Sequence, residues 1–541
     1  RRSLRMSADT SASRFVTTPI FYVNDVPHVG HAYTSIAADA VARFSRLDQR
    51  PTRFATGTDE HGEKVQQSAE KRGIAPQQFC DEVSESFQKL KGAFGLSNDV
   101  FVRTTAAEHK QAVQEMWKRL LAKGLIYKGT YEGWYSVRDE AFYTESELIE
   151  VDGEKRAPSG SVVEWRAKEP SYFFKLSEFT QPLLDYYEAN PDFLQPASRR
   201  NEVLSFVKEG LKDLSVSRTS FSWGVPVPDD DEHVVYVWID ALTNYLTVLG
   251  WPQSEQEEGG LYSTFWQNAV HIVGKDILRF HAVYWPAMLM GVGIPPPKKI
   301  FAHGWWTKDG EKISKSLGNV INPFELIDTY GVDATRYFLL SATSFGSDAD
   351  FSHQQMLVTC NGFLANCFGN LLNRAVTLSF KNCDKKAPGV PAPEALADAD
   401  KALLAAAQDL PDKLRGSYDA LKLHEACSVV EEILRQGNSY VDEQAPWTLR
   451  KTDPERFRTV IWTLLEVLRC CAIGIHPVMP EAAAKVLRQL GVAEDAVKAP
   501  TVAMIKEERC RIDGNDLPKP QPVFPRLDEE AILQSQAVVA E

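Results

Sequence analysis

The sequence has few cysteines, no excess of positive charge and no long apolar run. Its cysteines form no CxxC pair and no regular pattern, so neither a disulfide framework nor a cysteine zinc site is indicated. A formal net charge of -13 excludes a general nucleic-acid-binding surface, so any RNA contact must come from a local set of side chains. No apolar run is long enough to span a bilayer. We expect the cysteines to be reduced, buried thiols, as is usual in an intracellular protein; they are Cys80, Cys360, Cys367, Cys383, Cys427, Cys470, Cys471 and Cys510.

The length of 541 residues, with 44% hydrophobic and 25% charged residues, is typical of a globular chain with several domains. Residues 1–14 differ from the rest, because arginines lie among serines and Asp9 is the only acid there. This composition resembles the remnant of an organelle transit peptide, and a disordered tail of a cytosolic protein is the alternative. The chain starts at Arg1 rather than at methionine, so we expect part of the N-terminus to be missing.

Strand and helix patterns alternate near the start of the chain. The sequence predicts strands at Phe15–Tyr22 and Thr52–Thr58, and helices at Ala32–Ser45 and Lys64–Arg72. This alternation predicts a parallel sheet with crossover helices, whose ligands gather at the carboxyl ends of the strands.

Polar side chains follow both predicted strands. His28 and His31 lie at the turn before the first helix, where backbone N–H groups and the helix dipole suit a phosphate. The alternative is that both histidines only cap the helix or face solvent. Asp59 follows the second strand and is a candidate partner of a cationic amine, or a helix N-cap, or both.

The residue pattern changes in the middle of the chain. Short strands, hairpins and a helix at Arg200–Leu211 predict an insertion between two halves of the sheet, without any cysteine. Val234–Ala241 has the pattern of a buried strand, and His271–Asp276 that of a strand ending in a turn. The aromatic residues after them are either ordinary core or side chains that converge on the strand ends.

A glycine-bounded loop and a helical half follow. The loop carries Lys312 and Lys315 between serines, which suits a triphosphate whose charge must be neutralised, or else a solvated surface loop. Beyond Phe351 amphipathic patterns predict a helical bundle, and residues 516–541 predict a loosely packed tail. The predicted helices are Leu357–Phe380, Ala395–Asp409, Lys413–Asn438, Pro454–Gly474 and Pro480–Leu490.

Together these motifs resemble a known family. His28-Val29-Gly30-His31 and Lys312-Ile313-Ser314-Lys315-Ser316 match the HIGH and KMSKS motifs of class I aminoacyl-tRNA synthetases. Five more segments resemble the methionyl-tRNA synthetases of that class, at 19–24, 57–62, 236–241, 274–277 and 440–447. The resemblance covers residues 15 to about 510, and its specificity comes from the order of the whole set. Its bacterial style, with the arginine-rich start, indicates an organellar enzyme of a eukaryote, in the mitochondrion or chloroplast, with the cytoplasm as the alternative.

The resemblance implies an α/β fold. A Rossmann-like parallel-sheet catalytic domain would carry a connective insertion and be followed by an α-helical bundle that binds the anticodon. The implied segments are the start 1–14, the catalytic halves 15–126 and 231–300, the insertion 127–230, the KMSKS and stem-contact region 301–356, the anticodon-binding domain 357–515 and the tail 516–541.

The resemblance also implies a reaction, in which methionine and ATP form methionyl-adenylate and methionine is then esterified to tRNA(Met). The implied catalytic residues are His28, His31, Lys312 and Lys315. ATP would be bound by Gly30, His31, Gly274, Asp276, His303, Gly304, Lys312, Ser314, Lys315 and Ser316. Methionine would be bound by Ile20, Tyr22, Asp59, Trp238, Ala241, Tyr245, Phe280, His281 and Trp285. Asn370, Arg374 and Trp447 would recognise the CAU anticodon.

Some points depart from the family or stay open. Leu242 stands where some members have proline, so the local pocket wall differs. His281 either donates a hydrogen bond to the methionine sulfur or is a satisfied core histidine. Because the insertion lacks cysteines, we predict no zinc, and ATP with Mg²⁺ is expected as a substrate. The other expected partners are initiator and elongator tRNA(Met), no membrane is expected, and the chain is expected to be a monomer.

Three alternatives compete with this prediction. A synthetase for leucine, isoleucine or valine would carry a much larger editing insertion. A catalytically inactive, synthetase-like RNA-binding or regulatory protein should have lost His28, His31, Lys312 and Lys315, and all four are present. A small nucleotidyltransferase would lack the long helical half.

Overall fold

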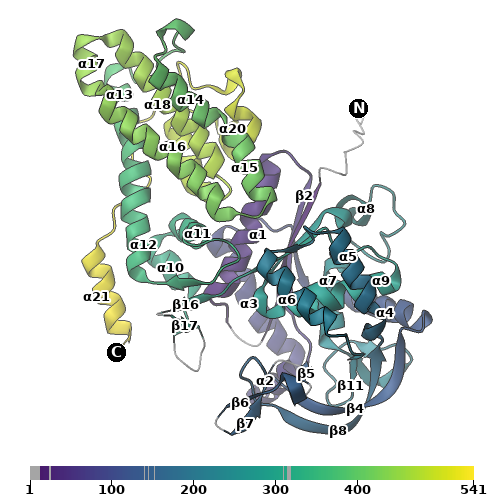
Figure 1. The fold of residues 1–541 in the computed structure, drawn as a ribbon. Coiled ribbons are helices and arrows are strands. Elements are labelled where there is room, and N and C mark those ends of the chain that lie inside the picture. The colour runs from purple at the N-terminus through teal and green to yellow at the C-terminus, as the bar shows by residue number, and fades with distance from the viewer. Residues whose placement is uncertain are drawn as a thin grey trace. The chain divides into compact units, whose positions relative to one another are not determined.

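The structure is a computed structural model that describes residues 13–23, 26–138, 141–143, 145–151, 153–308, 310–313 and 319–540 (Figure 1). The chain divides into two compact units, which we describe separately. The first unit comprises Arg1–Pro27, Arg53–Gly92 and Asn98–His303, and the second comprises His28–Thr52, Ala93–Ser97 and Gly304–Glu541. The finer division into seven segments stays a prediction.

A six-stranded sheet lies at the centre of the first unit, in the order β3-β2-β1-β14-β15-β9. Its ladders β1–β14, β14–β15, β15–β9 and β2–β3 are parallel, as predicted. All six residues of β14 are buried, as expected of an apolar strand covered on both faces. The strands are β1 (Arg14–Tyr22), β2 (Thr52–Asp59), β3 (Val100–Arg103), β9 (Leu194–Gln195), β14 (Ala269–Gly274) and β15 (Lys299–His303).

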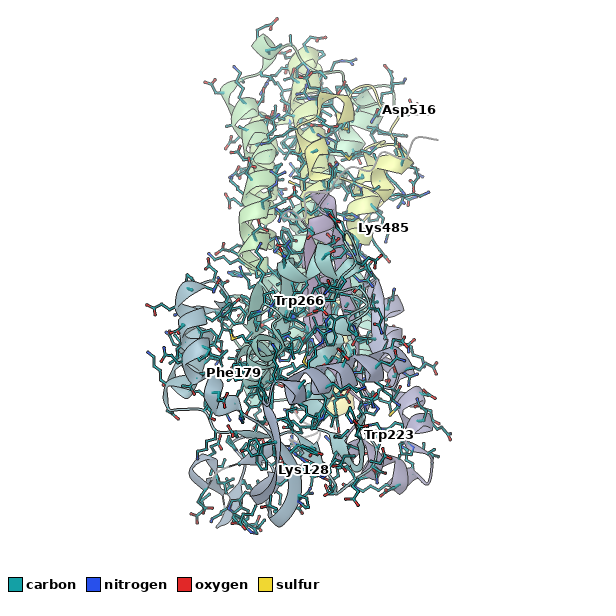
Figure 2. All side chains as sticks on the ribbon, turned by 90° about the vertical axis from the view of Figure 1, so that its right-hand side faces the viewer. Lys128, Phe179, Trp223, Trp266, Lys485 and Asp516 are labelled. Carbon is teal, nitrogen blue, oxygen red and sulfur yellow. The ribbon has the colours of Figure 1, made fainter. Side chains whose placement is uncertain are left out.

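Helices of the first unit contribute to one continuous hydrophobic core, two of whose members, Phe179 and Trp266, are labelled in Figure 2. The core combines sheet residues with apolar helix faces, so burial fixes the position of the strand ends. The helices that begin in this unit are α2 (Glu63–Arg72), α3 (Pro76–Phe94), α4 (Ala107–Ala122), α5 (Thr180–Ala189), α6 (Ala197–Lys208), α7 (Val237–Thr247), α8 (Leu261–Phe265) and α9 (Trp285–Val292).

The predicted insertion consists of short antiparallel sheets and helices. Figure 1 shows the long strands β4 and β8 paired, within the sheet order β10-β8-β4-β5. A hairpin of β6 and β7 and a sheet of order β11-β13-β12 complete it. Its strands are β4 (Ile126–Ser136), β5 (Ala141–Tyr143), β6 (Ile149–Val151), β7 (Glu154–Arg156), β8 (Glu164–Phe174), β10 (Leu214–Ser215), β11 (Ser217–Arg218), β12 (Pro226–Val227) and β13 (Asp230–Val235).

One predicted strand is wrong over most of its length. The pattern of Val234–Ala241 predicts a buried strand, but β13 ends at Val235 and α7 begins at Val237, which fits the helical spacing of Trp238, Ala241 and Tyr245. Every residue of α7 except Trp238 is buried. A helix buried on nearly all sides lacks the one-sided apolar stripe, so its short apolar run cannot be told from a buried strand.

The second unit is mainly helical, as predicted beyond Phe351. A small sheet of order β17-β16-β18 precedes the helices, and its strands are β16 (Trp306–Lys308), β17 (Glu311–Lys312) and β18 (Ala349–Phe351). The helices are α1 (Val29–Leu47), α10 (Pro323–Tyr330), α11 (Val332–Ser341), α12 (His353–Val358), the π-helical η8 (Thr359–Gly369), α13 (Asn370–Asn382), α14 (Asp398–Gln408), α15 (Leu410–Asp419), α16 (Leu423–Gln444), α17 (Pro446–Thr452), α18 (Pro454–Ile475), α19 (Pro480–Gln489), α20 (Glu494–Lys498) and α21 (Glu529–Ala540).

Two helical predictions differ from the structure. The helix expected at Lys413–Asn438 is two helices, broken at Leu421, whose φ of 56° lies in the left-handed region. Leu421 is fully buried, so burial of its side chain offsets the backbone strain. The tail expected to be loosely packed includes α21, and Asn361 of η8 donates a hydrogen bond to the Leu527 carbonyl at 3.1 Å. Short polar segments give no periodic signal of such docking.

Candidate active site

The histidine turn starts helix α1 in the second unit. His28 is the N-cap residue, and its Nδ1 accepts a hydrogen bond from the Gly30 backbone N–H at 3.1 Å. The backbone N–H of His28 in turn donates to Nδ1 of His31, also at 3.1 Å, which completes a capping box. The predicted capping role is therefore present. It does not exclude the phosphate role, because only one nitrogen of each ring is used in these bonds.

This arrangement sets the tautomers of both rings. Since each Nδ1 accepts a backbone hydrogen bond, the proton of each neutral imidazole resides on Nε2. Burial, and secondarily the neighbouring His28, holds the pKa of His31 well below its ordinary value. His31 is thus a neutral N–H donor at physiological pH, which suits hydrogen bonding to a phosphate oxygen.

The histidine turn has no room for a side chain at Gly30. A Cβ at this position would lie 2.9 Å from Cε1 of His28, closer than real Cβ atoms approach. The two histidine rings lie with centroids 3.9 Å apart, so the ring of His28 has little room to move aside. Glycine is needed here to seat the His28 ring against the first turn of α1, whether or not a nucleotide also approaches.

Helix α1 is held in the second unit by a buried ion pair. Arg336 of α11 donates to Asp39 of α1 at 2.7 Å, and both side chains are fully buried. Arg336 also donates to the backbone carbonyl of Phe94 at 3.1 Å and to that of Val478 at 2.8 Å. The position of α1, and with it the histidine turn, is therefore fixed by a buried hydrogen-bond network.

The lysine loop is only partly described. Lys312 ends β17, whose backbone pairs with Thr307 of β16. The predicted residues Ser314, Lys315 and Ser316 lie outside the described residues. Gly304, also in this unit, has no space for a side chain, because a Cβ would lie 2.3 Å from the Ser347 carbonyl oxygen.

The turn after β2 carries three ionisable residues in the first unit. Glu60 accepts hydrogen bonds from Arg103 at 2.6 and 3.0 Å and from Thr105 at 2.5 Å. The indole N–H of Trp223, which is labelled in Figure 2, donates to the Glu60 carbonyl at 2.6 Å. The side chain of Glu60, which had no predicted role, thus holds the turn in place.

The side chain of His61 also has a partner within the protein. Its Nδ1 lies 2.6 Å from Asp240 of α7, and both side chains are at most 2% exposed. The backbone carbonyl of Asp59 accepts a hydrogen bond from the Val23 N–H at 3.1 Å, and the residue is 8% exposed. Asp59 stays the predicted partner of a cationic ligand.

The predicted thioether residues come together in the first unit. The rings of Trp238 and Phe280 are stacked, with centroids 3.6 Å apart and planes 6° apart. Tyr245 lies 6.2 Å from Trp285 between ring centroids, and both are nearly inaccessible to solvent. Ile20, Tyr22, Trp238 and Phe280 are partly buried against the same core, which also includes Leu242. Phe280 and His281 begin a π-helical turn (Phe280–Tyr284), a feature often found at functional sites.

His281 is a satisfied histidine. Its Nδ1 donates to the Ile277 carbonyl at 2.9 Å, so its Nε2 is an acceptor, and the Tyr245 hydroxyl donates to it at 2.8 Å. Burial lowers the pKa of His281 to about 4, against opposing contributions from the Ile277 carbonyl and Asp276. The neutral ring can form part of a pocket wall, but both nitrogens already have protein partners.

We expect this buried neutral histidine to make the fold acid-sensitive. Its folded pKa lies below the unfolded value of about 6.5, so protons bind the unfolded chain more tightly, and stability falls between about pH 6.5 and about pH 4 by roughly 3 kcal/mol at most. Replacing His281 by glutamine should reduce the loss of melting temperature between about pH 7.5 and about pH 5. An unchanged loss would contradict the assignment.

Two further predicted residues lie at the end of β14. A Cβ on Gly274 would lie 2.5 Å from the carboxylate of Asp276, so glycine lets this side chain turn back over the strand end. A Cβ there would lie 3.8 Å from the ring of His303, the last residue of β15. Gly274, Asp276 and His303 are therefore gathered at the carboxyl ends of two neighbouring strands, where the parallel sheet predicts a ligand.

The predicted anticodon residues share one surface of the second unit. Asn370 and Arg374 lie one turn apart on α13, and Arg374 pairs with Asp442 of α16 at 2.8 Å. The guanidinium carbon of Arg374 lies 5.3 Å from the ring centroid of Trp447, which is 43% exposed. An exposed tryptophan beside a cation is suited to stacking an unpaired base.

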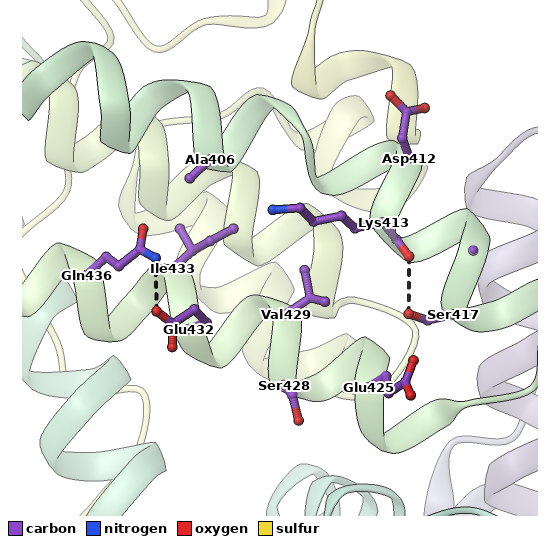
Figure 3. A pocket seen from close by; sticks show the side chains of 11 residues that line it. Ala406, Asp412, Lys413, Ser417, Glu425, Ser428, Val429, Glu432, Ile433 and Gln436 are labelled. Atoms are coloured by element: carbon purple, nitrogen blue, oxygen red, sulfur yellow. Dashed lines mark hydrogen bonds between the residues drawn. The ribbon is translucent and has the colours of Figure 1, made fainter. Parts of the chain in front are cut away.

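A groove of the helical unit contains none of the predicted site residues. It has a volume of about 560 Å³ and is lined mainly by α15 and α16, including Lys413, Glu425 and Glu432 (Figure 3).

Among the described residues, no group of three or more His, Cys, Asp or Glu side chains could hold a metal ion. In the same part of the chain, no helix has the length and apolarity needed to cross a membrane.

Comparison with known proteins defines the class. The family model described as "tRNA synthetases class I (M)" matches residues 14–155 and 154–376. The chain therefore belongs to the class I aminoacyl-tRNA synthetases. A second model, the "anticodon binding domain of methionyl tRNA ligase", matches residues 390–538. Within the class, the chain belongs to the methionyl-tRNA synthetase family.

Individual relatives agree over nearly the whole length. A methionine–tRNA ligase of Rickettsia bellii is 49% identical over 515 residues, covering 95% of this chain and 99% of the relative. The corresponding protein of Brucella suis is 48% identical over 516 residues, with coverage of 95% and 98%. The structure of Mycobacterium tuberculosis methionyl-tRNA synthetase in complex with methionyl-adenylate matches with a TM-score of 0.91 and 47% identity, covering 95% of this chain and all of the other. The predicted family and fold class are confirmed, and the alternatives are not favoured.

Proposed function

We propose that this protein is a methionine–tRNA ligase, which activates L-methionine with ATP and transfers it to tRNA(Met). The observation that carries the proposal is membership of the family along the catalytic and anticodon-binding segments together, at 14–376 and 390–538. Charging with methionine of a tRNA that has a CAU anticodon, and not of one with another anticodon, is the test. A chain that charges neither tRNA would contradict the proposal.

The first step needs positioning and charge stabilisation more than covalent help. A carboxylate oxygen of methionine attacks the α-phosphorus of ATP, the bond to the bridging oxygen breaks, and pyrophosphate leaves. His28 and His31 donate hydrogen bonds from Nε2 to the phosphates, and Lys312 and Lys315 neutralise the departing pyrophosphate. ATP enters as its Mg²⁺ complex, because the cation offsets the charge of the phosphates.

Methionine binds with its two ends in different environments. Asp59 pairs with the α-ammonium, while the stacked Trp238 and Phe280 and the buried Tyr245 enclose the thioether, which packs favourably on aromatic rings. Ile20, Tyr22, Ala241, His281 and Trp285 complete this pocket. Gly30, Gly274, Asp276, His303, Gly304, Ser314 and Ser316 belong to the ATP site. In the second step a terminal adenosine hydroxyl of the tRNA attacks the carbonyl of the adenylate, and AMP leaves.

Trp447 gives a test of anticodon recognition that is separate from methionine activation. We expect Trp447→Ala to lower kcat/KM for tRNA charging by roughly 10- to 100-fold, because base stacking on an aromatic ring contributes about 1–3 kcal/mol. Methionine-dependent pyrophosphate exchange needs no tRNA and should stay unchanged, and Trp447→Phe should lose less charging. Equal loss in both assays would contradict an anticodon role.

The proposed location is an organelle, mitochondrion and/or chloroplast. It is supported by the arginine- and serine-rich composition of residues 1–14 and by the similarity to bacterial relatives. Imaging of the natural full-length protein fused to a fluorescent protein tests it, and a purely cytoplasmic signal would contradict it.

We also propose that the protein is a monomer and binds no zinc. Light scattering tests the monomer. Elemental analysis tests the absence of zinc, and a finding of about one zinc per chain would contradict it.

A further inference from the structure

Asp240 is a buried carboxylate that the proposed reaction does not use. It is two residues after Trp238 on α7, so its side chain leaves the helix on nearly the opposite side. Its two oxygens receive two imidazoles, at 2.6 Å from His61 Nδ1 and 2.8 Å from His109 Nε2. Asp240 and His109 are fully buried. One carboxylate thus bridges three segments, which are the turn after β2, α4 and α7.

The hydrogen bonds of this bridge have a defined direction. A carboxylate can only accept, so His61 donates through Nδ1–H and His109 through Nε2–H. The other nitrogen of His109 lies 2.9 Å from the Thr247 hydroxyl of the same helix α7. Although burial raises the pKa of Asp240, the facing His61 and His109 lower it to about 2, so the carboxylate stays ionised. Charged hydrogen bonds of this kind are short and directional.

The turn that carries Asp59 also has contacts with neighbouring segments of the sheet. Arg103 and Thr105 hold Glu60, and Gly57 allows β2 to approach β3, since a Cβ there would lie 2.1 Å from the Val102 carbonyl oxygen. These contacts fix the turn to the sheet, and the hydrogen bond of His61 joins it to α7. The spacing between the turn and α7 therefore depends on the bond between His61 and Asp240.

We infer that Asp240 is a positioning residue for methionine activation, which through His61 sets the turn carrying Asp59 at a fixed distance from Trp238 and Ala241 on α7. This inference rests on the proposed function. Asp59 and α7 would bind the two ends of one amino acid. A fixed distance between them would therefore favour amino acids whose side chain has the length of methionine. An apolar substitute could make the core equally stable, and a buried ionic bridge instead favours one defined arrangement.

The test compares Asp240→Asn with wild type in amino-acid-dependent pyrophosphate exchange. We expect the KM for methionine to rise about tenfold, since a displaced binding group weakens ligand positioning, while the KM for ATP stays within about twofold. The preference for methionine over ethionine, which is one methylene longer, should also fall. Circular dichroism checks folding, and His61→Gln, which leaves Asp240 bonded to His109, is the second variant with the same expected shifts.

Asp400→Asn is the matched control. Asp400 is also a fully buried aspartate, which accepts from Arg456 and Tyr440 in the second unit. Its substitution should lower the melting temperature and leave both KM values and the ethionine preference unchanged. If either Asp240→Asn or the folded His61→Gln variant keeps the wild-type KM for methionine, or if both KM values rise equally, the inference is wrong. If the wild-type protein shows no methionine-dependent pyrophosphate exchange, the proposed function itself is wrong.

Discussion

Replacing His28 by asparagine is expected to lower kcat for methionine-dependent pyrophosphate exchange by about 10²–10³-fold, which is the usual cost of removing one transition-state donor. Asparagine is a favoured N-cap residue, so its side chain can replace the acceptor that His28 Nδ1 offers to the Gly30 N–H. It cannot replace the Nε2–H donor. The melting temperature should therefore change little, and the KM for methionine should stay close to that of wild type.

Two companion variants separate capping from catalysis. His28→Ala removes the cap as well, so it should lose the same activity and about 1 kcal/mol of stability in addition. Gly30→Ala keeps both histidines but places a Cβ 2.9 Å from the His28 ring, and it should lower kcat by displacing that ring. If His28→Asn retains most of the wild-type kcat, the turn is only a helix cap.

Replacing Asp59 by asparagine is expected to lower kcat/KM for methionine on the order of 10²–10³-fold, because truncating one partner of a buried ion pair costs roughly 2–5 kcal/mol. The loss should appear mainly in the KM for methionine. The neighbours Glu60 and His61 hold structural contacts instead, because Glu60 accepts from Arg103 and His61 bonds to Asp240.

A substrate analogue tests the Asp59 assignment directly. The α-hydroxy analogue of methionine lacks the ammonium group, so wild type should use it far less well than methionine. In Asp59→Asn this preference should largely disappear, since the variant has already lost the ion pair. Glu60→Gln is the control, which should destabilise the fold and keep the preference. A preference in Asp59→Asn equal to that of wild type would show that another group binds the ammonium.

The sequence predicted those features that depend on neighbouring residues. The apolar strand β1, the turn at His28 and the helix after it form one local pattern, and helix α1 begins only three residues before its predicted start. The capping box explains that difference, because a histidine cap is not among the common N-cap residues. The position of Asp59 after the second strand made it a candidate partner of an amine, whereas only the family resemblance assigned roles to Trp238 and Trp447.

Long-range partners were beyond sequence reasoning. Asp240 meets His61 across 179 residues and His109 across 131 residues, and no periodicity connects them. The pattern of Val234–Ala241 predicts a buried strand, and the helical spacing of Trp238, Ala241 and Tyr245 within and after it gives Asp240 no partner. The state of His281 was open for the same reason, since both of its partners, Tyr245 and Ile277, are fixed only by the fold.

The central claim is that this chain activates methionine. The most direct measurement is ATP–pyrophosphate exchange by the purified protein with methionine, isoleucine, leucine or valine supplied singly. The account predicts exchange that depends on methionine, with little exchange for the other three amino acids. Exchange that is faster with isoleucine, leucine or valine, or that does not depend on any amino acid, would contradict it.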